Sequence, residues 1–76
     1  MAFIPAPDRL KAFPGTERVK PRSRARRWLD GEYIYEWDGL HGRVEKYTKT
    51  GHHLGEYDPD NGELTKEADP ARRIEV

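Results

Sequence analysis

Residues 32–47, EYIYEWDGLHGRVEKY, carry the clearest structural signal in this 76-residue chain. Aromatic and β-branched residues dominate positions 32–37, and positions 42–47 alternate between polar and apolar side chains, which is typical of β-strands. Gly39 and Leu40 lie between the two segments and can close a tight turn. We therefore expect an antiparallel hairpin with Gly39 and Leu40 as its two-residue loop.

The pattern of strands and turns continues on the C-terminal side of this hairpin. Residues 48–51 form a second expected turn, residues 52–57 a third strand, and the Asp-Pro and Asn-Gly pairs within 58–62 the strongest turn signal in the chain. Residues 63–65 can add a short further strand. On the N-terminal side, Asp8 can cap one short helical turn that ends near Phe13. The expected fold class is mainly β (α+β), with three to four antiparallel strands and a short N-terminal helical segment.

Composition limits what the chain can be. Seventy-six residues allow one domain, and only 34% of them are hydrophobic, so the core is small. The absence of cysteine excludes disulfide scaffolds, thiol catalysis and cysteine-based zinc sites. No apolar run is long enough to span a bilayer, and the first residues lack the basic and apolar regions of a signal peptide.

Charge is distributed very unevenly along the chain, although its 14 basic and 14 acidic residues cancel. Residues 1–27 have a net charge of +6 and contain most of the prolines, whereas residues 28–76 have a net charge of −6. We divide the chain into a basic, proline-rich arm (1–27) and a folded domain (28–76). Such an arm suits a polyanionic partner, and the alternative is a solvated linker.

The expected hairpin places a set of polar groups on one face. With a two-residue loop, position 36 lies opposite 43 and position 34 opposite 45. Tyr33, Tyr35, Trp37 and Val44 then form the core face, and the other face is an exposed polar surface. That surface carries Glu32, Ile34, Glu36, Asp38, His41, Arg43, Glu45 and Tyr47.

A carboxylate and a histidine on one surface suit the cleavage of RNA. The reaction needs a base to remove the 2′-hydroxyl proton and an acid to protonate the departing 5′-oxygen. An arginine is the usual partner for the charge that develops on phosphorus. The alternative is structural: Glu36 and Arg43 would form a cross-strand ion pair, and His41 would be an ordinary turn residue.

We expect no metal site and no cofactor. His52 and His53 are adjacent in a strand, so their side chains point to opposite faces and cannot readily chelate one ion together. The sequence also lacks the His-x-His and His-Glu-x-x-His spacings of common metal sites.

Several motifs resemble one known family, the cytotoxic ribonuclease domain of the ribosome-inactivating E-group colicins and cloacin. The likeness covers residues 26–72 nearly without gaps and is clearest in the run Tyr-Glu-Trp-Asp-x-x-His-Gly at 35–42. It continues through Gly-His-His-Leu-Gly at 51–55 and Asp-Pro-Ala-Arg at 69–72. The resemblance implies a highly twisted antiparallel sheet and cleavage of 16S ribosomal RNA in the decoding A site, without a metal.

The resemblance also implies roles for individual residues. Glu45 would be the base, His41 the acid and Asp38 the group that orients His41, while Arg72 would stabilise the phosphorane and the product would be a 2′,3′-cyclic phosphate. Tyr47 would position substrate, and the arm would bind it through Arg22, Arg24, Arg26 and Arg27. A non-catalytic RNA- or ribosome-binding module with the same fold is the alternative.

The resemblance further implies two partners, the ribosome and a small acidic immunity protein. The toxin would act in the cytoplasm of a target bacterium, as part of a larger bacteriocin or alone. We expect the inhibitor to pair with basic residues of the arm or with Arg43, Arg72 and Arg73. The acidic residues Glu56, Asp58, Asp60 and Glu63 should lie away from that contact, around the turn at 58–62. One departure from the family is the neutral total charge, since such domains are usually strongly basic.

Overall fold

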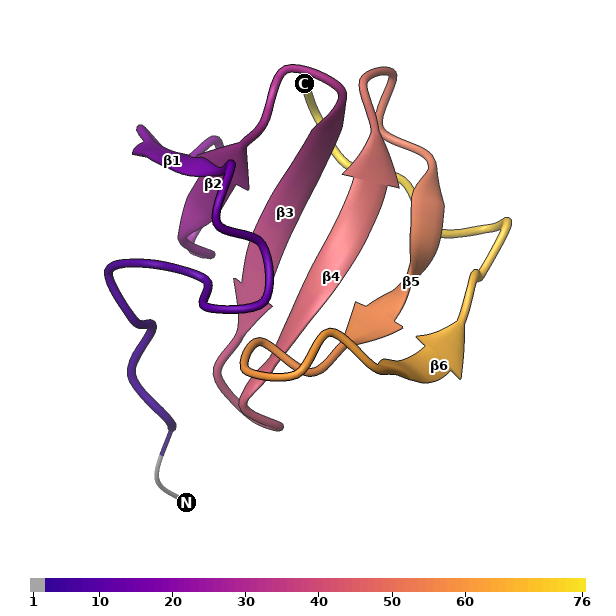
Figure 1. Ribbon diagram of the computed structural model, residues 1–76. Helices are drawn as coiled ribbons and strands as arrows, with labels where there is room; N and C mark the ends of the chain where they lie inside the picture. The colour runs from indigo at the N-terminus through magenta and orange to yellow at the C-terminus, as the bar shows by residue number, and fades with distance from the viewer. Residues whose placement is uncertain (1–2) are drawn as a thin grey trace.

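An antiparallel sheet of six strands, arranged in the order of the sequence, forms the part of the protein that the structure describes. The computed structural model describes residues 3–76; residues 1 and 2, the start of the expected arm, lie outside this description. The strands twist strongly across the sheet (Figure 1). Their bounds are β1 Glu17–Val19, β2 Arg27–Leu29, β3 Tyr33–Asp38, β4 Arg43–Thr48, β5 His53–Tyr57 and β6 Leu64–Glu67.

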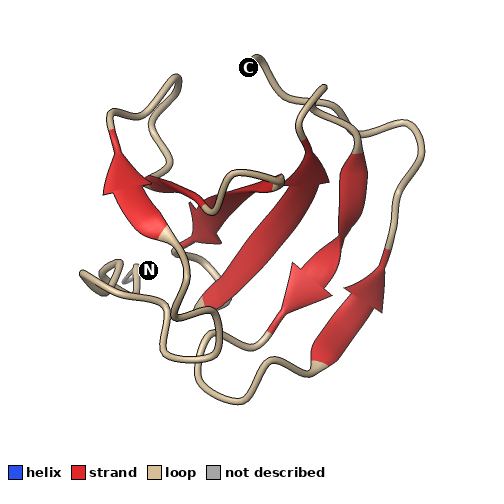
Figure 2. Ribbon diagram, turned by 45° about the horizontal axis from the view of Figure 1, so that its top comes forward, coloured by secondary structure: helices blue, strands red, loops and turns tan. Residues whose placement is uncertain are grey.

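The expectation of a mainly β, antiparallel fold is confirmed, but two details of it are wrong. The sheet has six strands rather than three to four, because β1 and β2 lie within or at the edge of the expected arm. No helix occurs within residues 3–76, and Figure 2 shows strands and loops only. Where a helical turn was expected, Phe13 N–H donates to Leu10 C=O and Thr16 N–H donates to Phe13 C=O. These bonds close two successive turns instead of starting a helix.

The β3–β4 hairpin has a longer loop than expected. Asp38 lies opposite Arg43 and Glu36 opposite Glu45, so residues 39–42 form a four-residue loop. The Asp38 carboxylate accepts hydrogen bonds from the backbone N–H groups of Leu40 and His41. Gly42, whose φ is 66°, donates its N–H to the carbonyl oxygen of Asp38 and closes the loop. The register therefore differs by two residues from the expected one. A shift of two keeps every side chain on its predicted face.

The main core lies between one face of the sheet and the N-terminal segment. Leu10, Trp28, Tyr35 and Val44 are buried there, and the partly buried rings of neighbouring aromatic residues pack around them. Residues 3–16 cross in front of this face in Figure 1. Trp28 is anchored by a hydrogen bond from Nε1 to the carbonyl oxygen of Asp8. The N-terminal segment thus supplies core material that the sheet lacks.

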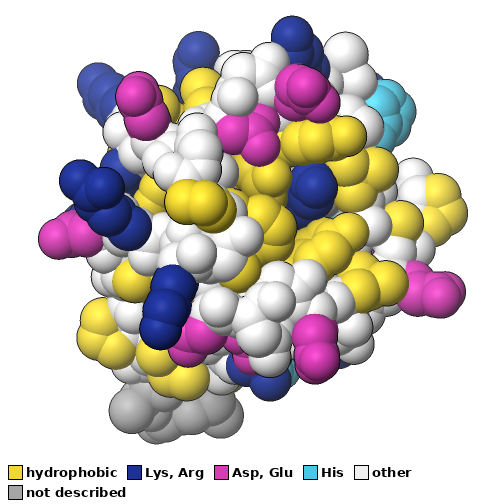
Figure 3. Space-filling model, viewed as in Figure 1, with side chains coloured by type: hydrophobic (Ala, Val, Ile, Leu, Met, Phe, Trp, Pro, Cys, Tyr) yellow, Lys and Arg dark blue, Asp and Glu magenta, His cyan; other side chains and the backbone are white. Residues whose placement is uncertain are grey.

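Lys46 sits among aromatic rings on this same face. Its Nζ lies 4.0 Å from the centroid of the Tyr33 ring and 5.5 Å from that of Tyr57, distances that suit cation–π attraction. Figure 3 shows hydrophobic side chains gathered around a cationic one in the middle of the face. Lysine is accommodated here because its aliphatic stem packs on the rings while its charge faces their electron-rich surfaces.

The second face of the sheet holds the polar residues and is closed by the C-terminal tail. His53 N–H donates to Arg72 C=O, and Ile74 N–H donates to Gly51 C=O, so residues 72–74 run beside the start of β5. Gly51 has φ 89°, and a Cβ there would collide with the carbonyl oxygen of Ile74. Glycine at position 51 is therefore what lets the tail approach this closely.

Candidate active site

Asp38 and His41 form a close pair at the end of the β3–β4 hairpin. His41 Nδ1 lies 2.7 Å from Asp38 Oδ2, and the His41 side chain is half exposed. Partial burial disfavours the ionised form of Asp38, but hydrogen bonds from the His41 ring and from the loop N–H groups outweigh it and lower the pKa of Asp38. The carboxylate is thus charged at neutral pH and holds the imidazole in one orientation.

A hydrogen bond from His53 holds the Glu45 side chain, and a second contact of the His53 ring determines its tautomer. His53 Nδ1 accepts a hydrogen bond from Asp69 N–H over 2.9 Å, so this nitrogen carries no proton. The ring proton must therefore sit on Nε2, which donates to Glu45 Oε1 over 2.8 Å. Both side chains of the pair are buried. Glu45 is consequently an ordered carboxylate whose Oε1 is already engaged.

The C-terminal tail brings Arg72 to the same place. Arg72 Nη1 lies 3.7 Å from Glu45 Oε1, and its guanidinium carbon lies 5.9 Å from the centroid of the Tyr47 ring. Partial burial disfavours the charged form of Arg72, but the nearby Tyr47, Glu45 and Asp38 raise its pKa. Nearly half of the Arg72 side chain is exposed, so the cation can meet an anion from solvent.

Tyr47 lies at the bottom of this cluster. Its side chain is fully buried, and its hydroxyl has no hydrogen-bond partner within residues 3–76. Burial raises the pKa of Tyr47; the charge of Arg72 opposes this effect, and the carboxylates of Glu36 and Glu45 add to it. The phenol is therefore neutral at physiological pH.

The structure brings together Glu45, Tyr47, Arg72 and the newly found His53, with the Asp38–His41 pair at the adjoining hairpin end. The expectation that both Glu45 and His41 are exposed is wrong for Glu45, which is 4% exposed because β5 and the tail cover this face. The expected alternative, a Glu36–Arg43 ion pair, is also wrong. Glu36 pairs with Arg27, and Arg43 lies 4.0 Å from Asp58.

Glu56 was expected around the turn at 58–62 and instead lies within the site. It is directly opposite Glu45 on β5 and is 4% exposed. One carboxylate oxygen of Glu56 and one of Asp38 lie with a His41 nitrogen inside a 4.8 Å cluster. Strand β5 has register shifts on both sides, between Lys46 and Tyr47 against β4 and between Glu56 and Tyr57 against β6. The sequence pattern did not reveal them.

The four arm arginines divide into two groups. Arg22, Arg24 and Arg26 are exposed in the segment that links β1 to β2. Arg27, by contrast, is 4% exposed, and its guanidinium bonds Glu36 Oε2 at 2.6 Å and the carbonyl oxygen of Glu75 at 2.8 Å. Arg27 thus ties β2 to β3 and to the C-terminal tail, and its donors are directed into the protein.

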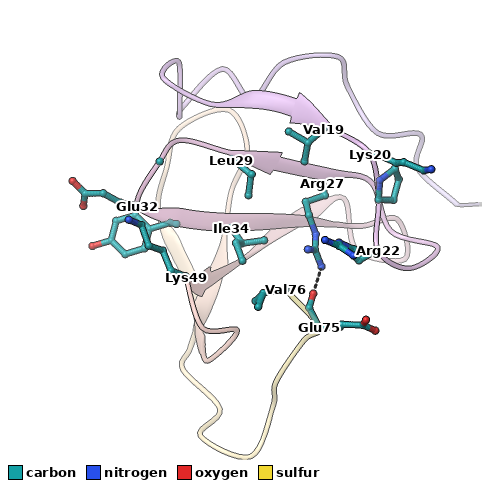
Figure 4. Close-up of a pocket in the computed structure, with 13 residues that line it drawn as sticks. Val19, Lys20, Arg22, Arg27, Leu29, Glu32, Ile34, Lys49, Glu75 and Val76 are labelled. Atoms are coloured by element: carbon teal, nitrogen blue, oxygen red, sulfur yellow. Dashed lines mark hydrogen bonds between the residues drawn. The ribbon is translucent and has the colours of Figure 1, made fainter.

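A groove of about 970 Å³ lies on the same face of the sheet, beside the Arg27–Glu36 pair. Val19, Leu29, Ile34 and Val76 line it with apolar side chains. Figure 4 shows Lys20 and Arg22 at one end and Lys49 at the other, with the Arg27–Glu75 hydrogen bond at its edge. The groove therefore has an apolar floor and cationic ends.

This arrangement provides the groups for acid–base chemistry on an anionic substrate: a fixed carboxylate, an exposed imidazole oriented by an aspartate, and a half-exposed arginine beside the carboxylate. His53 is the residue of this cluster that the sequence did not assign to the site. The turn expected at 48–51 is the sequence signal that could have identified it. A chain that reverses at this turn pairs β5 with β4, and His53 then lies opposite Tyr47.

Comparison with known proteins identifies the family of the chain. The family model Cytotoxic matches residues 4–75. Colicin E3 of Escherichia coli is 39% identical over 70 residues, covering 88% of this chain and 13% of the colicin. Colicin-E6 is 36% identical over 92% of the chain, and cloacin is 39% identical over 80% of it, both also from Escherichia coli.

The chain spans only 11–14% of the lengths of these relatives. The resemblance inferred from the motifs is confirmed by these matches. Within residues 3–76 there is no helix that is long and apolar enough to cross a membrane.

Proposed function

Since this chain belongs to the Cytotoxic family, we propose that it is the ribonuclease domain of a toxin that cleaves 16S ribosomal RNA at the decoding A site and halts translation. The relatives named above are colicins and a cloacin, which supports a bacteriocin origin. The single observation that carries the proposal is the ordered Glu45 carboxylate, held by His53 and faced by Arg72.

The proposed mechanism is metal-independent transfer within the RNA strand. Glu45 takes the proton of a ribose 2′-hydroxyl, and the resulting 2′-oxygen forms a bond to the adjacent phosphorus. Glu45 Oε2 is the proposed proton acceptor, since Glu45 Oε1 already accepts a hydrogen bond from His53 Nε2. The bond from phosphorus to the 5′-oxygen breaks, and His41 gives that oxygen a proton, leaving a 2′,3′-cyclic phosphate and a 5′-hydroxyl.

The remaining groups stabilise charge and position the reactants. Arg72 stabilises the extra negative charge on phosphorus in the transition state, and Asp38 orients the His41 ring. Tyr47 supports Arg72 and Glu45 from below, as its burial and their proximity suggest.

Arg22, Arg24 and Arg26 supply exposed positive charge for the phosphate backbone. The proposed path for the strand is the groove between Arg22 and Lys49, because its apolar floor suits bases and its cationic ends suit phosphates.

The proposed partners are the ribosome and a small acidic immunity protein, and the proposed place of action is the cytoplasm of a target bacterium. The inhibitor would pair with the exposed arginines of the arm and with the basic tail residues Arg72 and Arg73, both of which are exposed. Electrostatic attraction of this kind makes the association rate fall as ionic strength rises.

Incubation of the pure chain with intact ribosomes tests the function. The proposal requires one discrete fragment from the small-subunit RNA. Ribosome binding without any fragment would instead support the alternative, a non-catalytic ribosome-binding module with this fold.

A further inference from the structure

Glu56 is a buried carboxyl group that lacks the basic partner of its two neighbours. Glu36, Glu45 and Glu56 lie directly opposite one another on β3, β4 and β5, and all three are at most 7% exposed. Glu36 has Arg27 at 2.6 Å, and Glu45 has His53 at 2.8 Å and Arg72 at 3.7 Å. Among the residues described, 3–76, no basic side chain forms an ion pair with Glu56.

A hydroxyl group is the polar partner that Glu56 does have. Thr65 Oγ1 lies 2.6 Å from Glu56 Oε1. A hydroxyl can donate one hydrogen bond to a carboxylate but cannot neutralise its charge. Burial of a charge without a counter-ion is costly. A cation beside Glu56 would therefore be stabilised by the site as it is built.

Two further ligand groups are already in place beside Glu56. One N or O atom from each of Asp38, His41 and Glu56 lies within 4.8 Å of the other two. Ligands of Zn²⁺ lie about 2.0–2.2 Å from the ion, and three protein ligands with one open position are a common arrangement. The half-exposed His41 side chain sits on the hairpin loop and can make the small movement that convergence requires.

We propose that Asp38, His41 and Glu56 bind one divalent transition cation of the zinc class, and that this cation inhibits the enzyme reversibly. An imidazole and two carboxylates suit Zn²⁺, whereas Mg²⁺ prefers a near-ideal octahedron of oxygen ligands and keeps its water. The inhibition rests on the proposed function. A cation shared by Asp38 and His41 disrupts their 2.7 Å contact and removes the imidazole from proton transfer.

Binding is tested directly, without RNA, by calorimetric titration of the full chain with Zn²⁺ and by NMR of the histidine rings. Wild type should bind one Zn²⁺, with the His41 ring signals perturbed and those of His52 and His53 unchanged. Loss of even an outer partner of a metal ligand typically weakens binding about 10–100-fold. Glu56→Gln, which keeps an acceptor for Thr65, should therefore weaken Zn²⁺ binding by at least about tenfold.

Two variants make the result decisive. Glu63→Gln removes an exposed charge outside the cluster and should bind Zn²⁺ like wild type. His41→Ala changes an exposed position, keeps the protein folded and should weaken binding as Glu56→Gln does. Equal affinity in wild type and either cluster variant would overturn the site, as would perturbation centred on His52.

Ribosome cleavage separates this inference from the proposed function. Zn²⁺ should suppress cleavage by wild type and EDTA should restore it, while Mg²⁺ at the same concentration should have no effect. If the chain binds Zn²⁺ at His41 but never cleaves ribosomal RNA, the metal site is supported and the proposed ribonuclease function is contradicted. Cleavage at an unchanged rate with Zn²⁺ bound would contradict the inhibitory role of the cation.

Discussion

His53 Nε2 lies 2.8 Å from Glu45 Oε1, and this hydrogen bond fixes the carboxylate that we propose as the general base. The ring itself is fixed from behind by Asp69 N–H, so the pair extends from the tail through β5 to β4. The base is therefore positioned by contacts from β5 and from the C-terminal tail, and neither belongs to the hairpin that contains Glu45.

Replacement of His53 should uncouple Glu45 from this support. We expect His53→Ala to lower the single-turnover cleavage rate by about 100-fold, since small displacements of a reacting group can cost that much. His52→Ala is the matched control, because His52 is the neighbouring residue and is exposed. Unfolding curves of both variants separate a rate effect from loss of the fold. Equal rates for the two variants would contradict the role of His53.

Gly51 should control the position of Arg72 through the tail. Gly51→Ala introduces a Cβ into the carbonyl oxygen of Ile74, which displaces the tail that carries Arg72. Gly31→Ala is the control, since Gly31 has nearly the same φ, 91° against 89°, and nothing within 4 Å of the added Cβ. Both variants suffer the same backbone strain, but Gly51→Ala alone should lose cleavage by an additional ten- to hundredfold or so. A similar cleavage rate in both would show that tail placement is unimportant.

Arg27 should matter for stability more than for RNA binding. Its guanidinium is buried in a pair with Glu36, and removal of one partner of a buried pair typically costs about 3–5 kcal/mol. Arg27→Ala should lower the free energy of unfolding in urea by about that amount. Arg26→Ala removes the exposed neighbouring charge and should change stability by less than about 0.5 kcal/mol. If Arg27→Ala is as stable as Arg26→Ala, the tie between β2, β3 and the tail is not important for the fold.

The ionised Asp38 should stabilise the protein in a pH-dependent way. Hydrogen bonds lower its pKa in the folded state below the ordinary value of 3.8. The stabilisation is therefore complete above the unfolded-state pKa and disappears as the pH falls through the folded-state value. The stability difference between wild type and Asp38→Asn should be constant near neutral pH and shrink below about pH 4. A difference that grows in acid, measured by urea unfolding, would contradict this assignment.

Much of the site was predictable because strand faces depend on parity. Glu36, Asp38, Glu45 and Tyr47 were assigned to one face with a two-residue loop, and the observed four-residue loop shifts the register by two. Such a shift leaves the faces unchanged. Asp38 sets the longer loop through its side-chain bonds to the N–H groups of Leu40 and His41. A pattern of apolar and polar residues does not contain that information.

The features that escaped prediction depend on contacts between distant segments. His53 and Glu56 reach the site through the irregular β4–β5 pairing. Arg72 was named from the family resemblance, but the hairpin could not place it, and it reaches the site through the returning tail. Neither the irregular pairing nor the return of the tail has a local sequence signal. The same strands bury Glu45, which the hairpin alone would expose. On the opposite face, Leu10 completes the core from within the expected arm. The helical turn predicted in this segment is absent, and a loop places Leu10 in the core cluster with Trp28 and Tyr35.

The rate at which Glu45→Gln cleaves 16S ribosomal RNA in intact ribosomes, measured under single-turnover conditions, tests the central claim most directly. Gln keeps the size of the side chain and an oxygen that can accept the hydrogen bond from His53. It cannot act as a base toward a 2′-hydroxyl. Wild type and the exposed control Glu63→Gln should both yield one discrete fragment at similar rates, and Glu45→Gln should be slower by roughly 10²–10⁴. Cleavage by Glu45→Gln at the wild-type rate would contradict the account.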